Sequence, residues 1–344
     1  MNYLLAGTYT KAQSKGIYVY RFDPASGALF RCGYCQVANP SYIAFGPLNE
    51  YIYSVSENET GRSYANSFYF DRHEGKLSLL NRRVTGGAGA CHIAVDPRGR
   101  FAVTANYGGG SISVFPIDKD ARLKTRNQEI IFNGKSKHPE RQEAPHPHCT
   151  LFSPEGKYAF VTDLGTDKIH RFEIHYGRGK FLDEESKKIF DVKPGSGPRH
   201  MVFHPNKKYL YLVNELSGTV AVFLYISGNL EPVQEIPIGP RLQEGGGAIA
   251  LSREGTSLFV SLREGNDGIA SYRVGKNGKL KQTGFFPTHL HPRDIGLSPD
   301  GKYLMAAALK ENLIETWKVT ADGRSIRQTA LSAIDSPTFV GFLP

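Results

Sequence analysis

The sequence predicts an all-β protein, a seven-bladed β-propeller whose blades have four strands each. The first observation is a repeat of about 50 residues, the length of one propeller blade. It aligns on a turn residue, and the gaps between successive copies are 50, 57, 51, 48, 46 and 45 residues. The aligned residues are Pro47, Pro97, Pro154, Pro205, Arg253 (which replaces proline), Pro299 and Pro344. The second observation is the absence of helical periodicity, since no window sustains apolar residues at spacings of three and four.

Each repeat contains the signals of four short strands. A short apolar strand leads into a Pro-x-Gly type turn, and a second strand rich in Tyr, Val and Leu follows. The third strand is represented by "SISVFPI" at 111–117 and "TVAVFLY" at 219–225, and the weaker fourth by "NLEPVQEI" at 229–236. Four strands at this period are typical of a propeller blade. The single tryptophan and the lack of Gly-His…Trp-Asp pairs argue against WD40 blades.

The two ends of the sequence predict how the last blade is completed. The final copy, "TFVGFLP" at 338–344, stops after its first strand. The chain begins with second- and third-strand material, "NYLLAGTYT" at 2–10 and "GIYVYRFD" at 16–23. We therefore expect one blade to be shared between the N- and C-terminal strands, which would remove open sheet edges. Residues 1–344 are predicted to form one domain.

Composition limits the classes of function. The chain has 344 residues, 40% hydrophobic and 22% charged, which is typical of a globular protein. No apolar run approaches the roughly 20 residues that a membrane helix needs, and residues 1–16 lack the basic start of a signal peptide. A cytoplasmic protein without a membrane partner is expected. The net charge of +9 comes from scattered residues with no nucleic-acid motif, so no nucleic-acid partner is expected.

The four cysteines and the H-x-H motif do not predict a metal site. Cys32 and Cys35 form a C-x-x-C without a second pair at zinc spacing, and Cys91 and Cys149 are isolated. His146 and His148 could chelate zinc, but no third ligand is marked by spacing. We expect small buried cysteines, and neither metal nor cofactor.

The repeat also predicts where polar side chains meet. In a blade the end of the second strand returns to the mouth of the central channel where the first strand begins. Positions six before and nine to ten after each aligned residue therefore share one mouth. The first set is Ser41, Cys91, His148, Arg199, Gly247, Arg293 and Thr338. The second set is Ser56-Glu57, Asn106-Tyr107, Asp163-Leu164, Asn214-Glu215, Leu262-Arg263 and Ala308-Leu309.

Arg199 and Glu215 are thus predicted to be neighbours in a ring of polar groups around one funnel. A concave site with convergent polar groups is the usual hypothesis for a ligand site. The alternative is an ion pair that plugs the channel. The repeat also carries an insertion at 133–148 at this mouth, where Lys135, Lys137, His138 and Arg141 could approach an anionic ligand. A solvated loop is the alternative there.

Several motifs together resemble one family. They are "GTYT" at 7–10, "CHIAVDP" at 91–97, "TANY" at 104–107, "RQEAPHPH" at 141–148, "DLGTDKI" at 163–169, "GSGPRH" at 195–200 and "VNEL" at 213–216. With these the whole chain resembles the seven-bladed propeller lactonases, the bacterial 6-phosphogluconolactonase type that also includes carboxymuconate-cyclising enzymes. The resemblance implies hydrolysis of a sugar lactone, 6-phosphogluconolactone first, in the oxidative pentose phosphate pathway. A non-catalytic binding propeller and a carboxymuconate-type cycloisomerase remain as alternatives.

The resemblance implies four catalytic groups, which fall on His148, Arg199, Glu215 and Arg263. Opening a lactone needs a base for the attacking water and positive charge for the oxyanion. Glu215 is favoured as the base with His148 as the alternative, and the two arginines would serve the oxyanion or a phosphate. Substrate contacts are expected from further residues near the same mouth: Glu57, His92, Asn106, His146, Asp163, His200, Asn214 and Arg293.

The chain departs from the family pattern in two blades. Asn266 replaces a histidine in "LREGN", and Ala307-Ala308-Leu309 replaces Ala-Asn-Gln. The second change removes polar groups from the mouth and bears on the exact lactone.

Overall fold

The computed structural model describes residues 2–48, 50–177, 179–240, 243–320 and 326–343. The last aligned residue of the repeat, Pro344, lies outside them. The described residues group into two compact units, residues 1–34 with 200–344 and residues 35–199. The boundaries between the units fall inside strands β3 and β16. The single domain remains a prediction.

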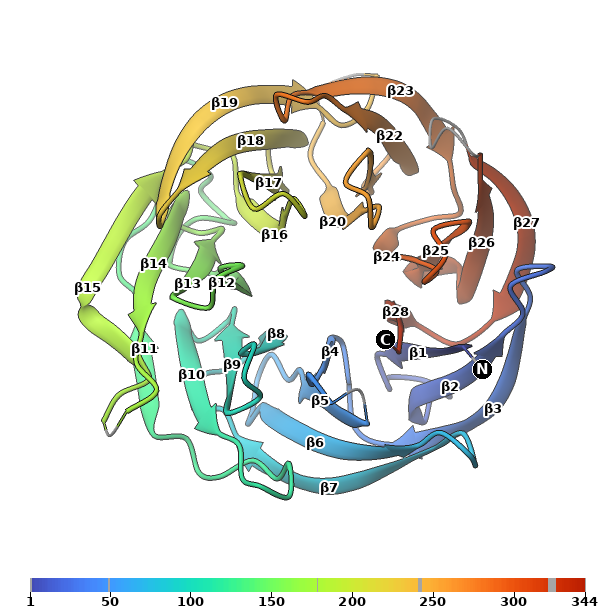
Figure 1. Cartoon of the computed structure of the whole chain (residues 1–344), viewed down its shortest axis with the longest axis horizontal. Helices are drawn as coiled ribbons and strands as arrows, with labels where there is room; N and C mark the ends of the chain where they lie inside the picture. The colour runs from blue at the N-terminus through green and yellow to red at the C-terminus, as the bar shows by residue number, and fades with distance from the viewer. Residues whose placement is uncertain (1, 49, 178, 241–242, 321–325, 344) are drawn as a thin grey trace. The chain divides into compact units, whose positions relative to one another are not determined.

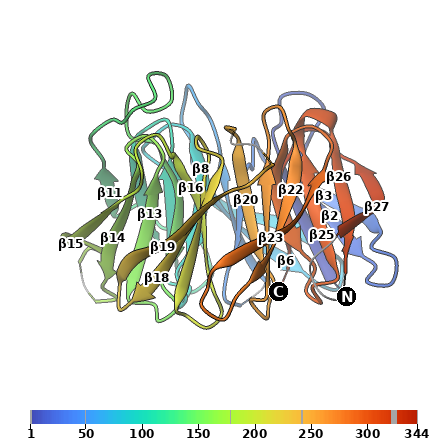
Figure 2. The same cartoon turned by 90° about the horizontal axis from the view of Figure 1, so that it is seen from above.

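The first unit holds four four-stranded antiparallel sheets. One contains β28 (Pro337–Phe342), β1 (Asn2–Thr8), β2 (Gly16–Phe22) and β3 (Leu29–Gln36). The next contains β16 (Pro198–Phe203), β17 (Tyr209–Asn214), β18 (Thr219–Ile226) and β19 (Asn229–Pro237). The others are β20 (Gly246–Leu251), β21 (Ser257–Leu262), β22 (Gly268–Val274) and β23 (Leu280–Pro287), and β24 (Pro292–Leu297), β25 (Tyr303–Ala308), β26 (Leu313–Val319) and β27 (Ile326–Ala333). Figure 2 shows their twist, with β18 and β19 running obliquely.

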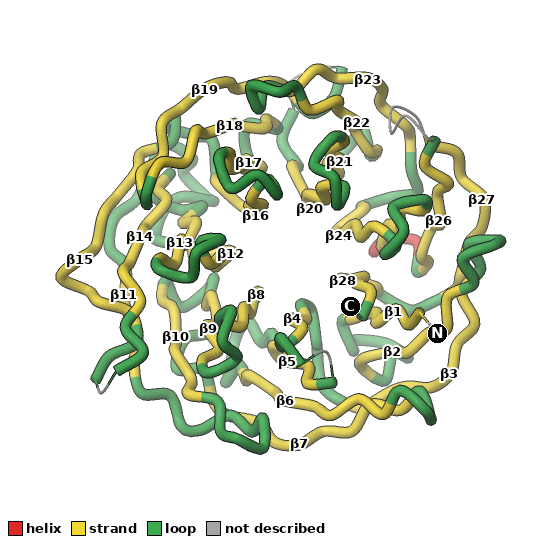
Figure 3. Tube along the Cα trace, viewed as in Figure 1, coloured by secondary structure: helices red, strands yellow, loops and turns green. Residues whose placement is uncertain are grey.

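The second unit holds three sheets of the same kind. They are β4 (Ile43–Phe45), β5 (Tyr51–Ser56), β6 (Tyr64–Asp71) and β7 (Lys76–Val84); β8 (Ala90–Val95), β9 (Phe101–Asn106), β10 (Ser111–Pro116) and β11 (Gln128–Ile131); and β12 (Pro147–Phe152), β13 (Tyr158–Asp163), β14 (Lys168–Ile174) and β15 (Leu182–Asp191). Among the described residues the one helical segment is the 3₁₀ turn η1 (Leu309–Glu311), drawn red in Figure 3. The described part of the chain also has no helix that is long and apolar enough to cross a membrane.

The predicted sharing of one sheet between the two ends is confirmed. Strand β28 pairs antiparallel with β1, with Val340 opposite Ala6, and Figure 1 shows the two strands side by side. Strand β2 follows on the other side of β1. The seven four-stranded sheets thus match the predicted blades, including the one completed by both ends.

The Pro-x-Gly turn between the first and second strands has a local cause. In "DPRGRF" the Asp96 carboxylate accepts the backbone N–H groups of Arg98, Arg100 and Phe101. The turn needs a left-handed residue two places after the aligned proline, and Gly99 supplies it with φ 67°. Lys207 adopts the same conformation, φ 62°, in the fourth copy.

Apolar cores lie between neighbouring sheets within each unit. Tyr211 and Val213 of β17 cluster with Leu258 and Val260 of β21, and all four side chains are fully buried. Every second residue of these strands is apolar and faces the neighbouring sheet. Burying one such side chain contributes about 1.5–3 kcal/mol, so these interfaces hold the strand ends in place.

Candidate functional site

A β-bulge recurs near the start of the first strand of the sheets. In three sheets the pairing with the second strand skips one residue, which is Cys91, His148 or Arg293. Thr338 is skipped in the same way in β28. These are the positions six before the aligned residue. A bulged residue is left out of the ladder and its side chain is re-aimed, which is common next to active sites.

The two strand ends lie together as predicted. In six sheets the residue just after the second strand donates its backbone N–H to a carbonyl two residues before the bulge position. The donor and acceptor pairs are Tyr9 and Ser336, Glu57 and Asn39, Tyr107 and Gly89, Leu164 and His146, Arg263 and Gly245, and Leu309 and His291. This bond places the two sets of predicted polar positions at one end of each sheet.

In the first unit Glu215 and Arg263 form a buried ion pair. Arg263 Nη2 donates to Glu215 Oε2 at 2.6 Å, and the residues are 5% and 7% exposed respectively. Arg263 Nη2 also lies 3.4 Å from the Gly246 carbonyl oxygen, and Nη1 lies 3.3 Å from His291 Nε2. A buried pair of this kind lacks the screening that weakens surface ion pairs, so it fixes the relative position of both side chains.

Two glycines bring these residues together. The Glu215 carbonyl accepts the N–H groups of Gly245 and Gly246 at 2.8 and 3.1 Å, while Arg263 N–H donates to the Gly245 carbonyl at 2.9 Å. Gly245 has φ 111°, and a Cβ there would lie 1.7 Å from the Arg263 carbonyl oxygen. Only glycine fits at position 245, in the "EGGG" segment that leads into β20.

Arg293 and His200 are the other predicted residues of the first unit near these strand ends. Arg293 Nη2 donates to the Tyr9 hydroxyl at 2.7 Å and its guanidinium lies 5.3 Å from the centre of the Tyr9 ring. Tyr9 belongs to the "GTYT" segment. His200 is buried in β16.

In the second unit Tyr107 lies between two histidines. Its ring stacks on His146 with centroids 4.4 Å apart and meets His148 edge-on at 5.8 Å. His146 Nδ1 lies 3.0 Å from the Tyr107 carbonyl oxygen and its Nε2 lies 3.1 Å from Glu143 Oε1. Arg141 Nη2 donates to the Tyr107 hydroxyl at 3.3 Å. The insertion thus contributes Arg141 and Glu143 to this cluster.

His92 and Arg199 are both buried in the second unit. Burial, and then the charge of Arg199, lower the pKa of His92 from 6.5 to about 3. The His92 ring packs on Tyr42 at 4.1 Å and its Nε2 lies 3.5 Å from Cys149 Sγ. The imidazole is therefore neutral at physiological pH. Arg199 is 3% exposed, and its carbonyl accepts from the Thr162 hydroxyl at 2.7 Å.

Three predicted substrate contacts hold turns inside their own sheets. Asn106 Nδ2 donates to the hydroxyls of Ser111 and Ser113, and Asn214 Nδ2 donates to that of Thr219. The Asp163 carboxylate accepts from the backbone N–H groups of His146 and Gly165 and from the Thr166 hydroxyl. All three side chains are fully buried. Glu57 is partly buried, and its backbone pairs with Asn39.

The cysteines are the next candidate ligands for a metal ion. The four cysteines are free, with Cys32 exposed and Cys35, Cys91 and Cys149 buried. Cys32 and Cys35 are three residues apart on strand β3, so they point to opposite faces of the sheet. Among the described residues no group of three or more His, Cys, Asp or Glu could hold a metal ion.

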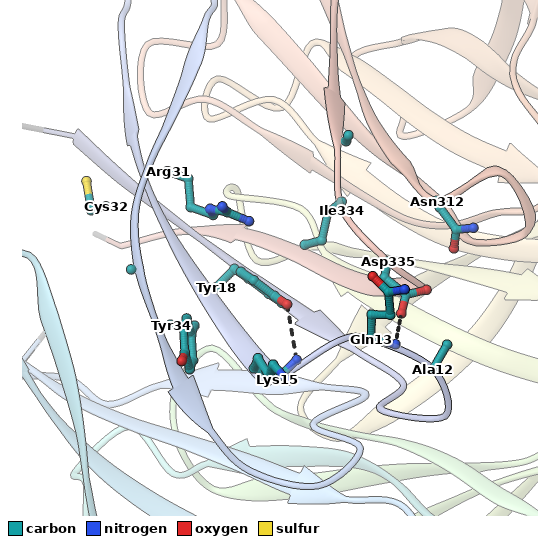
Figure 4. Close-up of a pocket in the computed structure, with 12 residues that line it drawn as sticks. Ala12, Gln13, Lys15, Tyr18, Arg31, Cys32, Tyr34, Asn312, Ile334 and Asp335 are labelled. Carbon is teal, nitrogen blue, oxygen red and sulfur yellow. Dashed lines mark hydrogen bonds between the residues drawn. The ribbon is translucent and has the colours of Figure 1, made fainter.

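A pocket of about 820 Å³ lies elsewhere in the first unit. Figure 4 shows Tyr18 and Arg31 from β2 and β3 on one side and Asp335 on the other. Asp335 Oδ2 accepts the N–H of Gln13 at 2.7 Å, so the carboxylate fastens the loop before β2. No predicted site residue lines this pocket. The buried polar clusters are the stronger candidates because they bring opposite charges and histidines together.

Comparison with known proteins identifies the family. Residues 3–342 match the family model described as "Lactonase, 7-bladed beta-propeller". The chain belongs to this lactonase family. It is 33% identical to the 6-phosphogluconolactonase of Bacillus subtilis (strain 168) over 98% of this chain and 97% of that protein.

Two solved structures of this lactonase type are similar over their whole length. One is a putative 6-phosphogluconolactonase from Bacteroides fragilis, with a TM-score of 0.96, 38% identity, and coverage of 100% of this chain and 98% of that one. The other is the periplasmic gluconolactonase of Pseudomonas aeruginosa, with a TM-score of 0.94, 28% identity, and coverage of 100% and 99%. The predicted seven-bladed propeller and the resemblance are confirmed.

Several residues of the clusters were missed by the sequence analysis, among them Tyr107, His291 and Glu264, whose Oε1 lies 3.0 Å from His291 Nδ1. Tyr107 stands in a predicted mouth pair, but only its neighbour Asn106 is among the predicted substrate contacts. His291 and Glu264 flank Arg293 and Arg263 by one or two residues and had no motif of their own. The signal that could have found Tyr107 is its place just after a strand, which it shares with Glu215 and Arg263.

Proposed function

We propose that this chain hydrolyses 6-phosphogluconolactone to 6-phosphogluconate, as a step of the oxidative pentose phosphate pathway. The observation that carries the proposal is the buried pair of Glu215 and Arg263 in a chain that aligns over 98% of its length with a 6-phosphogluconolactonase. A non-catalytic binding protein and a cycloisomerase are not favoured, because the named relatives are lactonases.

The proposed reaction needs no group beyond the side chains described. A base, Glu215 or His148, takes a proton from water as its oxygen attacks the lactone carbonyl carbon. Guanidinium groups of Arg199 or Arg263 stabilise the oxyanion. The ring C–O bond then breaks, and the leaving alkoxide receives a proton to give a hydroxyl and a carboxylic acid. The arginine not used at the oxyanion, or Arg293, would hold the phosphate.

The remaining predicted residues are proposed to contribute to substrate binding, some directly and some through the turns that they hold. His146 lies just before β12 and His200 lies in β16, and both are buried. Asn106, Asp163 and Asn214 would act through the turns that they hold, because their polar atoms already bind within their sheets.

Plain gluconolactone is the second candidate substrate. The similarity to the periplasmic gluconolactonase of Pseudomonas aeruginosa favours it. We propose a cytoplasmic location, which the free cysteines support because exposed thiols persist in reducing compartments. Fractionation of cells that express the chain would test the location.

The deciding experiment is a substrate panel. Purified protein is assayed with 6-phosphogluconolactone, gluconolactone and a carboxymuconolactone, each corrected for spontaneous hydrolysis. The proposal expects the highest kcat/KM for the phosphorylated lactone, with activity unchanged by EDTA. A higher kcat/KM for gluconolactone would transfer the assignment to the plain sugar lactone. No activity on any of the three would reject the function.

A further inference from the structure

The Arg263 guanidinium is held on two sides. Its Nη2 donates to Glu215, and its Nη1 lies 3.3 Å from Nε2 of the buried His291. A guanidinium has only donors, so His291 Nε2 must be the acceptor and must carry no proton. The ring proton then lies on Nδ1. We propose that His291 is a positioning residue of the candidate lactone site, which as the Nδ1–H tautomer holds Arg263 against Glu215.

Glu264 supplies the reason for that tautomer. Its Oε1 lies 3.0 Å from His291 Nδ1, and its Oε2 lies 3.4 Å from Lys310 Nζ. The negative charge of a carboxylate beside one ring nitrogen favours a proton on that nitrogen. Half of the Glu264 side chain is exposed, whereas Glu215 and Arg263 are buried. A chain of contacts therefore runs from Lys310 at the surface through Glu264, the neutral His291 and Arg263 to the buried Glu215.

The repeat shows that the fold does not require a histidine at position 291. The His291 carbonyl accepts the Leu309 N–H, and the same acceptor position is occupied by His146 in one other sheet and by Asn39, Gly89, Gly245 and Ser336 in four others. These four have positive φ, as His291 does with φ 62°. The left-handed conformation is unfavourable for a residue with a Cβ.

Glycine would satisfy the same backbone without that strain, as Gly89 does with φ 60°. A strained non-glycine residue at such a position points to a role for its side chain. The contact that His291 makes and that Gly89 cannot make is the one with an arginine of the site. The backbone conformation at position 291 therefore serves the blade, whereas the imidazole of His291 serves the position of Arg263.

The kinetic test rests on the proposed function and uses two variants of the full chain. His291→Gly should keep or raise the melting temperature because it relieves the backbone. It should lower kcat/KM for the lactone by about 10–100-fold, mostly in kcat, because a misplaced catalytic group costs about that much. His291→Gln places an amide oxygen near Nε2 and should recover activity to within a few-fold of wild type.

Two outcomes would overturn the proposal. One is a glycine variant as active as wild type, and the other is a glutamine variant as impaired as the glycine variant. His73→Gly, a change in the β6–β7 turn, is the control for substitution of histidine by glycine and should leave kcat unchanged.

A second measurement does not depend on activity. Nitrogen-15 NMR of protein labelled at histidine distinguishes the two neutral tautomers, and the His291 signal is identified by its loss in His291→Gln. We expect the Nδ1–H form, and a shift toward a mixture in Glu264→Ala. An Nε2–H form would overturn the proposal. If the wild-type protein hydrolyses no lactone, the proposed function is wrong. The tautomer of His291 then still shows whether its Nε2 accepts from Arg263.

Discussion

At the scale of single residues, the two roles proposed for Glu215 conflict. A general base must take a proton, whereas its ion pair with Arg263 at 2.6 Å favours the charged carboxylate and holds it still. The pair therefore positions Glu215, but its contact with Arg263 competes with the proposed use as a base. Loss of the base lowers kcat, whereas loss of the ion pair lowers stability, so the two roles can be separated.

We predict that Glu215→Gln lowers kcat by about 10²–10⁴-fold, the usual effect of removing a general base. It should also lower the melting temperature, because the buried charge of Arg263 loses its partner at a cost of up to about 3–5 kcal/mol. The double variant Glu215→Gln with Arg263→Met should regain stability without activity. Steady-state kinetics and thermal melting measure both effects.

The control is Glu235→Gln, which changes a carboxylate that accepts from Thr219 on the outer strand β19. Its kcat should match wild type. If Glu215→Gln keeps more than about a third of wild-type kcat, the base is His148 and Glu215 serves Arg263 alone.

The sequence predicted which strand ends lie together at the candidate site but not which side chains contact one another there. Each mouth pair has one residue that ends the strand and one that follows it. Asn106, Asp163 and Asn214 end strands, and their side chains bond within the sheet. Tyr107, Glu215 and Arg263 follow strands and contact other site residues. Which side chain of a pair faces the candidate site depends on the local bulges and turns. The bulge residues Cys91, His148 and Arg293 are of different chemical types, so no common sequence pattern marks them.

At the scale of elements, the repeat predicted the strands because each element is specified locally. A left-handed residue two places after the aligned residue, such as Gly99 or Lys207, and short apolar strands recur along the repeat. The ion pair of Glu215 with Arg263 joins residues 48 apart in the chain. Such a pair depends on packing between sheets and on the glycines at 245 and 246, which a single repeat does not encode.

Strand β28 offers a test of how the first unit is completed. Deletion of residues 337–344 removes the partner of β1 and the buried bond from Val340 N–H to the Asp294 carboxylate. The exposed edge of β1 is a template for association between chains. We predict a lower melting temperature and aggregates by size-exclusion chromatography.

A synthetic peptide of residues 334–344, added to the shortened chain, should restore the elution profile and the melting temperature of the full chain. A peptide with the same residues in scrambled order is the control and should restore neither. An unchanged melting temperature after the deletion would contradict a structural role for this pairing.

At the scale of the whole molecule, buried histidines set how stability depends on pH. The pKa of His92 is lowered to about 3, and burial also lowers the pKa of His170 despite Asp163 beside it. The unfolded chain therefore binds protons at these histidines where the folded chain does not. Their contribution to stability is complete above the ordinary pKa of about 6.5 and is lost as the pH falls toward 3.

Glu315 acts in the opposite direction. Burial raises the pKa of its carboxyl above 4.5, although His289 and Gln328 bind it. The folded chain then keeps a proton that the unfolded chain releases, so the contribution of Glu315 is present at low pH and is lost as the pH rises through its folded pKa. Between pH 6.5 and 4.5 the histidine effect should exceed this, since two buried histidines oppose one carboxyl.

We predict that the free energy of unfolding falls by up to about 1.4 kcal/mol per pH unit for each such histidine as the pH drops below 6.5. His92→Gln removes one of these protons and should flatten the dependence measured by urea unfolding between pH 6.5 and 4.5. Glu315→Gln should steepen it, because the opposing carboxyl is lost. A His92→Gln protein as acid-sensitive as wild type would show that His92 takes up its proton in the folded state, contrary to its burial beside Arg199.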